Sequence, residues 1–416
     1  MQSIYVHGGK PISGTVRIGG AKNSALKLMA ASILAPGVTR ITNVPAIADV
    51  TIMSEVLRSL GADVHEGDHE LTIDASGIDT FEAPYELVAQ MRAAVDVLGP
   101  LLARFGRARV AMPGGCNIGA RKLDLHMKGL GAMGVSFETD HGYIDAQVNG
   151  KLHGASITFD FPSVGATENV MMAAVRAEGH TTIDNAAREP EIADLANMLV
   201  EMGAKISGQG TPTIEVDGVD ELHPVDHRTV GDRIEAGTYL VAGALMGGPL
   251  TTVGADPAHL TLALEKLRRM GVSVETGSQT ITVSRTGDLQ PCDIQTLPHP
   301  GFPTDLQAQF MVLAALAKGS SVITENVFEN RFMFASELSR MGADVRIEGH
   351  HALINGVPKL EGAPVRSTDL RGGAALVLAG LAADGETVVS GVHHIDRGYE
   401  DYVGHLRALG ADIDRR

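Results

Sequence analysis

The stretch LRSLGADV, at Leu57–Val64, decides the fold because variants of it recur along the whole chain. The apolar residues before its glycine follow a helical period, and the residues after it alternate as in a strand. The glycine stands just past the helix, where a left-handed backbone favours a residue without a Cβ atom. Each copy therefore predicts a helix, a turn and a strand. The further copies are GLGAMGVSF at 129–137, LVEMGAKI at 199–206, LRRMGVSV at 267–274, LSRMGADV at 338–345 and LRALGADI at 406–413.

The copies keep a nearly constant spacing, which indicates a structural repeat. Their glycines, at positions 61, 134, 203, 271, 342 and 410, are by subtraction 73, 69, 68, 71 and 68 residues apart. An alanine-rich helix that ends in glycine precedes each copy, as in KLMAASILAPGVTRI and YLVAGALMGGPLTTV. Small alanines let helices lie close together, so we expect these helices to be buried by surrounding sheets.

Six repeats predict two domains of three repeats each. A single core stops growing at roughly 250 residues, and the chain has 416. The last repeat ends the chain without its final strand, whereas residues 1–21 contain the strand-like stretches SIYVHG and GTVRIGG. We therefore predict an α/β protein with a first domain at residues 22–230. The second domain comprises residues 231–416 and is completed by the strands of residues 1–21.

Charge and composition exclude several classes of function. A formal net charge of −16 argues against nucleic acid as a partner, because phosphate-backbone binding requires a basic surface. No stretch approaches the roughly 18 uninterrupted apolar residues of a membrane span, and the opening MQSIYVHGGK has no export signal. We expect a soluble, cytoplasmic protein without a membrane partner, whose cysteines, Cys116 and Cys292, stay reduced.

Polar residues collect at the starts of the alanine-rich helices, where equivalent positions of the repeat should lie close together. Helix starts present free N–H groups and the positive end of the dipole, so converging starts favour an anion. Serine, threonine, aspartate or asparagine can instead be an N-cap, which explains any single one of them. Lysine and arginine are not caps and require another role. The residues concerned are Lys22, Asn23, Arg92, Ser163, Thr167, Asp232, Arg233, Asp305, Asp369 and Arg371.

Arginines also occur in four loops that follow strands of the repeat. Arginines on separate loops suit multidentate binding of phosphate or carboxylate. The alternative is that they pair with neighbouring acids such as Glu329, Asp396 and Glu400, as exposed arginines often do. The four are Arg121, Arg188, Arg331 and Arg397.

Cys116 lies in PGGCNIGAR, at 113–121, among three glycines and a proline. Arg121 and Lys122 stand close by in the sequence and favour a thiolate. A cysteine is otherwise often a small buried apolar residue, which is the interpretation we give to Cys292.

Twelve segments spread over the whole chain resemble the UDP-N-acetylglucosamine 1-carboxyvinyltransferases, a family of enolpyruvyl transferases. So many matches in one order are far more specific than a single short motif. The segments are GAKNSAL, MRAAVDVLGPLLARFG, PGGCNIGARKLDLH, SVGAT, NAAREPEI, ISGQGT, DRIEAGTYL, PHPGFPTDLQAQF, ITENVFENRFM, ELSRMGA, TDLRGGAALVLAG and HHIDRGYE.

The resemblance implies two inside-out α/β barrels, each of three repeated units, with the active site in the cleft between them. It implies that phosphoenolpyruvate and UDP-N-acetylglucosamine react to give the 3-O-enolpyruvyl sugar nucleotide and phosphate. This reaction starts the synthesis of peptidoglycan precursors in bacteria. No metal ion or organic cofactor is implied.

The resemblance also implies roles for residues, with Cys116, Asp305, Lys22 and Arg397 as the catalytic ones. Cys116 matches the cysteine that protonates the enolpyruvyl methylene and forms a covalent phosphoenolpyruvate adduct. Asp305 matches the carboxylate beside the sugar 3-hydroxyl, a candidate general base. Lys22, Arg121 and Arg397 match cations around phosphoenolpyruvate. The other matches hold or border the substrates: Asn23, Arg92, Lys122, Leu123, Asp124, Leu125, Ser163, Val164, Val327, Arg331, Asp369 and Arg371.

One segment departs from the family pattern. Some relatives carry a lysine that contacts the nucleotide shortly before SVGAT, whereas this chain has Asp160, Phe161 and Pro162 there. Nucleotide affinity is therefore open, and stacking and backbone contacts are an alternative way to hold the uridine. Two rival functions are transfer to shikimate 3-phosphate and a non-catalytic paralogue. The PGGCNIGAR loop and the DLH after it favour the sugar nucleotide, and the presence of Cys116, Lys22 and Asp305 favours an enzyme.

Overall fold

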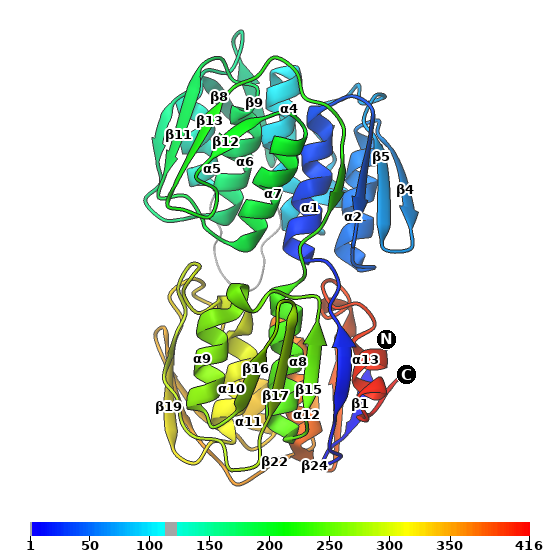
Figure 1. Cartoon of the computed structure of the whole chain (residues 1–416), viewed down its shortest axis with the longest axis vertical. Coiled ribbons are helices and arrows are strands. Elements are labelled where there is room, and N and C mark those ends of the chain that lie inside the picture. Colours follow the sequence, from blue (N-terminus) through cyan, green and yellow to red (C-terminus); the bar gives the residue numbers. More distant parts are fainter. Residues whose placement is uncertain (1, 113–122) are drawn as a thin grey trace. The chain divides into compact units, whose positions relative to one another are not determined.

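A computed structural model describes residues 2–112 and 123–416 of the chain, and within these ranges the chain forms two compact units (Figure 1). The first unit comprises residues 20–112 and 123–230. The second unit comprises residues 2–19 and 231–416. Each unit has its own apolar core, and the buried residues of the two cores do not mix.

The described part of the first unit contains three four-stranded sheets. Their strand orders are β14-β3-β5-β4, β6-β7-β9-β8 and β10-β11-β13-β12. In each sheet the first two strands are parallel and the other neighbours are antiparallel. The strands are β3 (Val38–Thr42), β4 (Asp63–Gly67), β5 (Glu70–Asp74), β6 (Glu82–Ala83), β7 (Arg107–Ala111), β8 (Val135–Asp140), β9 (Tyr143–Val148), β10 (Ser156–Thr158), β11 (His180–Asp184), β12 (Lys205–Ser207), β13 (Thr213–Asp217) and β14 (Asp226–Arg228).

The second unit has the same kind of sheets, with the orders β16-β17-β15-β2, β18-β19-β21-β20 and β23-β25-β1-β26, and a short β22-β24 pair. Strand β1 lies antiparallel between β25 and β26, and β2 lies parallel to β15. The strands are β1 (Ile4–His7), β2 (Gly14–Arg17), β15 (Leu250–Val253), β16 (Ser273–Thr276), β17 (Thr280–Ser284), β18 (Ile294–Gln295), β19 (Ser320–Thr324), β20 (Asp344–Glu348), β21 (His351–Asn355), β22 (Leu360–Glu361), β23 (Pro364–Arg366), β24 (Ala383–Asp384), β25 (Glu386–Ser390) and β26 (Asp412–Arg415).

The alanine-rich helices form the inside of each unit, as their composition predicts, and Figure 1 shows them surrounded by sheets and outer helices. In the second unit the three inner helices pack against one another. The inner helices are α1 (Lys22–Ala31), α4 (Leu98–Phe105), α6 (Val164–Ala174), α8 (Arg233–Met246), α10 (Gln307–Ala315) and α12 (Leu370–Ala382).

The outer helices end at the glycines of the repeat. All six of these glycines have positive φ, between 85° and 106°, which confirms the predicted left-handed turn. The outer helices are α2 (Ala48–Ser59), α5 (Asp124–Ala132), α7 (Pro190–Glu201), α9 (Thr261–Arg269), α11 (Ala335–Arg340) and α13 (Tyr402–Ala408). The remaining helical turns are α3 (Tyr85–Val88), η1 (Ser32–Leu34), η2 (Arg92–Val97), η3 (Pro257–Leu260), η4 (Thr304–Leu306) and η5 (Val392–His394).

Arg92 does not begin an α-helix, although its alanine-rich segment predicts one. It begins the 3₁₀ helix η2, and α4 starts only at Leu98. Pro100 has no N–H group, so an α-helix that began at Arg92 would lose an internal hydrogen bond at that point. Within the first turn of α4 the missing N–H group is tolerated.

Candidate functional site

Lys22, the first residue of α1, is held by a carboxylate from the next helix. Its Nζ lies 2.8 Å from Oδ2 of Asp49 on α2, and the two side chains are 12% and 1% exposed. A cation at a helix start is disfavoured by the dipole, and the nearby carboxylate offsets this cost. The Lys22 side chain is thus a largely buried, paired cation at the start of α1.

The other described site residues of the first unit also lie at helix starts. Asn23 follows Lys22 in α1, and Arg92 begins η2. Ser163 is the N-cap of α6, because its Oγ accepts a hydrogen bond from the Ala166 N–H group at 3.3 Å. Val164 is the first residue of the same helix.

Asp124 and Leu125 begin α5, and Leu123 precedes it. The Asp124 side chain is exposed, whereas those of Leu123 and Leu125 are half-buried. Cys116, Arg121 and Lys122 lie outside the described residues.

Asp305 is the centre of an ion-pair group in the second unit. Its Oδ1 accepts a hydrogen bond from Nη2 of Arg331 at 2.7 Å, and its Oδ2 accepts one from Nη2 of Arg371 at 3.2 Å. The carboxylate is 23% exposed, whereas the arginine side chains are 3% and 4% exposed. Two buried cations therefore hold one carboxylate that still reaches the surface.

Arg371 stays charged in spite of its burial. Burial acts to lower its pKa, but Tyr399, Asp305 and Asp232 outweigh this effect and raise the pKa above its usual value. The guanidinium carbon also lies 5.2 Å from the centre of the Tyr399 ring, within the range of a cation–π contact.

Asp369, unlike Asp305, is explained by a capping role. Asp369 is the N-cap of α12 and accepts hydrogen bonds from the Arg371 and Gly372 N–H groups, both at 3.0 Å. Asp232 caps α8 in the same way.

Arg397 is half-buried and lies between η5 and α13.

Val327 lies in a loop that a buried glutamate organises. Oε1 of Glu325 accepts hydrogen bonds from the Val327 and Phe328 N–H groups at 2.8 and 3.1 Å. Its Oε2 accepts one from the Thr304 hydroxyl at 2.9 Å, next to Asp305. Glu325 therefore fixes the loop and the turn that carries Asp305.

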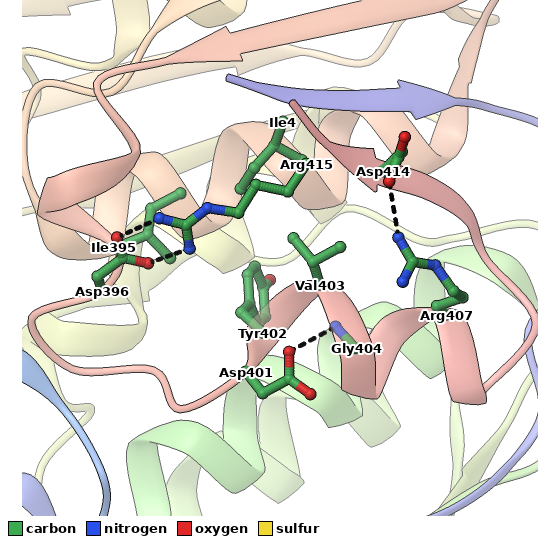
Figure 2. A pocket seen from close by; sticks show the side chains of 10 residues that line it. All are labelled: Ile4, Ile395, Asp396, Asp401, Tyr402, Val403, Gly404, Arg407, Asp414 and Arg415. Carbon is green, nitrogen blue, oxygen red and sulfur yellow. Dashed lines mark hydrogen bonds and ion pairs between the residues drawn. The ribbon is translucent and has the colours of Figure 1, made fainter. Parts of the chain in front are cut away.

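Two ion pairs differ from the pairing of loop arginines with neighbouring acids. Arg331 pairs with Asp305 across 26 residues, and Asp396 pairs with Arg415 at 2.7 Å. The Asp396–Arg415 pair lines a cavity of about 220 Å³ beside α13, shown in Figure 2. Both arginines of this cavity, Arg407 and Arg415, are bound to carboxylates, so it lacks the cationic surroundings that a phosphate requires.

Cys292 is a buried thiol, which confirms its interpretation as a small buried residue. Burial raises its pKa, which makes it a poor nucleophile at neutral pH. Among the described residues, no group of three or more histidine, cysteine, aspartate or glutamate side chains is arranged to hold a metal ion. Nor does any helix in residues 2–112 and 123–416 combine the length and apolar content needed to cross a membrane.

The segment that departs from the family pattern lies beside a lysine from another element. Nζ of Lys128, on α5, is 2.8 Å from Oδ2 of Asp160. Phe161 next to it is 41% exposed. A cation thus lies close to the start of α6, although the segment before SVGAT contains none.

Sequence reasoning missed two residues that hold site residues in place, Asp49 and Glu325. The partner of Asp49, Lys22, lies on another helix, and Glu325 binds Thr304 on another segment as well as N–H groups of its own loop. The segment ITENVFENRFM contains Glu325, but nothing in the pattern distinguishes it from Glu329, which is exposed. Burial is the property that separates the two, and it follows from tertiary packing.

Known proteins that are similar to this chain over nearly its whole length are carboxyvinyltransferases. A family model described as EPSP synthase (3-phosphoshikimate 1-carboxyvinyltransferase) matches residues 6–406. The UDP-N-acetylglucosamine 1-carboxyvinyltransferase of Corynebacterium jeikeium is 53% identical over 413 residues, which cover 99% of each chain. A protein of the same name from Geotalea uraniireducens is 51% identical and covers 100% of this chain and 99% of its own.

Solved structures agree. The enolpyruvyl transferase NikO from Streptomyces tendae matches with a TM-score of 0.90 at 31% identity, over 100% of this chain and 98% of that chain. The EPSP synthase from Acinetobacter baumannii matches with a TM-score of 0.77 at 19% identity, over 100% of both chains. The second likeness concerns the fold alone. Together these matches confirm the predicted two-domain α/β fold class.

Proposed function

We propose that this chain, which belongs to the enolpyruvyl transferase family, moves the enolpyruvyl group of phosphoenolpyruvate to the 3-hydroxyl of UDP-N-acetylglucosamine. One observation supports UDP-N-acetylglucosamine as the acceptor of the enolpyruvyl group. Relatives named UDP-N-acetylglucosamine 1-carboxyvinyltransferase are 51–53% identical over essentially the whole chain, whereas the EPSP synthase structure is 19% identical. The sugar nucleotide is therefore favoured over shikimate 3-phosphate.

The reaction requires an acid, a base and several cations. A proton adds to C3 of phosphoenolpyruvate while the sugar 3-hydroxyl oxygen bonds to C2 and loses its own proton to a base. The adduct then loses a proton from C3 and the C–O bond to phosphate breaks, which restores the enol ether. General acid and base groups, and cations placed near the phosphate, lower the barriers to both steps.

In this proposal Cys116 donates the proton to C3 and also forms the covalent adduct, and Asp305 accepts the hydroxyl proton. The contacts of Asp305 support its role, because Arg331 and Arg371 fix the carboxylate and stabilise its negative charge. Lys22, Arg121 and Arg397 surround phosphoenolpyruvate. The ion pair between Lys22 and Asp49 supports the assignment of Lys22, since it orders the ammonium group before a ligand arrives.

The remaining residues hold the sugar nucleotide. Lys122 lies outside the described residues. The others lie at helix starts of the first unit, at the start of α12, or, for Val327 and Arg331, in a loop of the second unit, where N–H groups and side chains can contact diphosphate and sugar. These residues are Asn23, Arg92, Lys122, Leu123, Asp124, Leu125, Ser163, Val164, Val327, Arg331, Asp369 and Arg371.

Phosphate release tests the function directly. The purified protein is assayed with phosphoenolpyruvate and either UDP-N-acetylglucosamine or shikimate 3-phosphate. We expect release with the sugar nucleotide alone, and loss of most of it in Asp305→Asn, which keeps the size of the side chain. Release with shikimate 3-phosphate would overturn the choice of acceptor, and release with neither would favour a non-catalytic paralogue.

The proposed reaction extends to a cellular role and an inhibitor. We place the enzyme in the cytoplasm, at the first committed step of peptidoglycan precursor synthesis, which links it to cell shape and division. An epoxide of the fosfomycin type should alkylate Cys116, because a thiolate near cations is the stronger nucleophile. Mass spectrometry of the treated protein checks this, and an adduct on the buried Cys292 instead would contradict the assignment.

A further inference from the structure

Three buried polar residues occupy equivalent positions on the inner segments of the first unit. Lys27, Asp96 and Asn169 each lie ten residues before the glycine that follows the inner helix of their repeat, at Gly37, Gly106 and Gly179. Their exposed fractions are 7%, 2% and 0%. With the buried side chains of His126 and Glu168 they form a group that we call the inner polar cluster.

Lys27 binds both carboxylates of the cluster. Its Nζ lies 3.3 Å from Oε2 of Glu168 and 3.6 Å from Oδ2 of Asp96. Burial acts to lower the pKa of Lys27, but Glu168 and Asp96 outweigh it and raise the pKa, so the ammonium group stays charged. Nζ also donates a hydrogen bond to the carbonyl oxygen of Asn23 at 3.2 Å. One side chain therefore joins α1, η2 and α6.

Asn169 connects the same cluster to α5. Its Nδ2 lies 3.3 Å from Oδ1 of Asp96 and 3.1 Å from Nδ1 of His126. Its Oδ1 accepts a hydrogen bond from the Gly99 N–H group at 2.7 Å. Burial, and then the charge of Arg92, lower the pKa of His126 to about 4. The imidazole is thus neutral at physiological pH, and its Nδ1 can accept the Asn169 hydrogen bond.

The segments joined by this cluster carry the described substrate-binding residues of the first unit. Asn23 lies on α1 and Arg92 on η2. His126 directly follows Asp124 and Leu125. Glu168 and Asn169 belong to α6, whose first turn follows Ser163. A displacement of any of these segments would separate side chains that must meet one ligand.

We propose that Lys27 is a positioning residue, which through the inner polar cluster holds α1, η2, α5 and α6 in the arrangement that binds the sugar nucleotide. Lys27 contacts no substrate in this proposal. It acts through the Asn23 carbonyl and through its two carboxylate partners. The inference rests on the proposed function, because it assigns the ligand that these helix starts hold.

Close packing makes the arrangement sensitive to small shifts. A Cβ atom added at Gly165 would lie 3.0 Å from Cε1 and 3.1 Å from Nε2 of His126. A Cβ atom at Gly99 would lie 2.3 Å from the Asn169 carbonyl oxygen. Both glycines allow a helix to approach the cluster, so the segments have little freedom to move independently.

The test is a kinetic comparison of Lys27→Met with wild type. Methionine keeps the length and apolar stem of lysine and removes its charge. We expect the KM for UDP-N-acetylglucosamine to rise about tenfold or more while kcat changes by less than about threefold. Asp96→Asn, which keeps the hydrogen bond to Asn169, should move the KM in the same direction by a smaller factor, and it serves if Lys27→Met fails to fold.

Arg104→Met is the matched control. Arg104 is a half-buried cation of the first unit, on α4, and it donates hydrogen bonds to the Ile33 and Ala75 carbonyl oxygens at 2.9 and 3.0 Å. Its substitution should lower the melting temperature without changing the KM. An equal rise in KM in Arg104→Met would reduce the effect of Lys27 to general destabilisation and refute the proposal, as would a wild-type KM in Lys27→Met.

Amide hydrogen exchange separates a failure of this inference from a failure of the proposed function. A wild-type protein that releases no phosphate would refute the function. Exchange at residues 22–26, 92–98 and 124–128 still reports on the cluster in that case. Faster exchange there in Lys27→Met, but not in Arg104→Met, supports the positioning role, and unchanged exchange in both contradicts it.

Discussion

The two units are built from the same repeat, yet they fill the same inner layer with different chemistry. The first unit places Lys27, Asp96 and Asn169 at equivalent positions there, and Lys27 contacts the carboxyl groups of Asp96 and Glu168. The second unit places Thr238 and Gln309 at the corresponding positions, ten residues before Gly248 and Gly319. Nε2 of Gln309 donates a hydrogen bond to the Thr238 hydroxyl at 3.0 Å, and that hydroxyl lies 2.9 Å from the Tyr399 hydroxyl.

The difference shows that the fold does not require charge in this layer. In the second unit this layer is neutral and hydrogen-bonded. The ion pairs of Asp305 with Arg331 and Arg371 lie closer to the helix starts. Buried ion pairs carry a desolvation cost that apolar or neutral groups avoid. Charge inside the first unit therefore indicates a role other than stability, which is consistent with a positioning function.

The largest effect is expected in the second unit. Asp305→Ala leaves the buried guanidinium groups of Arg331 and Arg371 without their shared carboxylate. Removal of one partner from a buried ion pair costs about 3–5 kcal/mol. Denaturant unfolding should show this loss. Asp256→Ala, which removes a helix cap elsewhere in the unit, should cost about 1 kcal/mol. Equal losses of unfolding free energy in the two variants would mean that the ion pairs of Asp305 stabilise the unit no more than a helix cap does.

The next effect compares the inner layers themselves. Lys27→Met leaves the buried Asp96 without its cation, at an expected cost of about 2–3 kcal/mol. Glu168 adds little to this cost, because burial raises its pKa to about 8 and it already holds a proton at neutral pH. Thr238→Val removes a neutral hydroxyl and should cost about 1 kcal/mol. Melting temperatures of the two variants decide whether the charged layer is the more sensitive one. A Thr238→Val variant that is the less stable of the two would reverse the comparison.

Sequence predicts the fold well because the repeat carries its own boundaries. Each glycine of the repeat ends a helix in a conformation that other residues rarely adopt, so Gly61 and its counterparts locate the turns without any tertiary information. The η2 helix is the exception. Alanines in its sequence favour an α-helix, and the position of Pro100 relative to Arg92 makes the difference.

Candidate site residues are predicted where their chemistry is unusual for their position. Lys22 and Arg371 stand at helix starts that disfavour cations, and this conflict singles them out. Partners are much harder to predict, because Asp49 and Glu325 differ from exposed acids only through packing. Lys27 is missed for a related reason. It lies within an apolar helical pattern, and its meaning depends on Asp96 and Glu168, which are far away in the sequence.

A pH effect is expected from one buried carboxyl in each unit. Burial raises the pKa of Glu168 to about 8, and burial followed by Asp232 does the same for Glu235 on α8. The folded protein then holds a proton that the unfolded chain has lost, so stability falls as the pH rises from about 5 to 8. Glutamine does not titrate. As the pH rises over this range, the melting temperature of Glu168→Gln should therefore increase relative to that of wild type by a few degrees.

The same measurement on Glu235→Gln provides the matched variant in the second unit. His126, whose lowered pKa acts in the opposite sense below about pH 6.5, is present in both proteins and cancels in each difference. A constant difference between Glu168→Gln and wild type across the range would show that Glu168 is ionised throughout.

The smallest effect concerns charge on the surface of the first unit, at the ion pair between Lys128 and Asp160. The side chains are 48% and 80% exposed, so water screens the pair and Lys128→Ala should leave the melting temperature unchanged. Nucleotide binding is the more sensitive property, because Lys128 is a cation close to the start of α6. Lys128→Ala should raise the KM for UDP-N-acetylglucosamine about two- to fivefold, and Asp160→Ala, which frees the ammonium group, should lower it. Both changes should shrink at high salt. If both variants instead move the KM in the same direction, then Lys128 does not act on the nucleotide through its charge, and only the buried charges of this unit matter for binding.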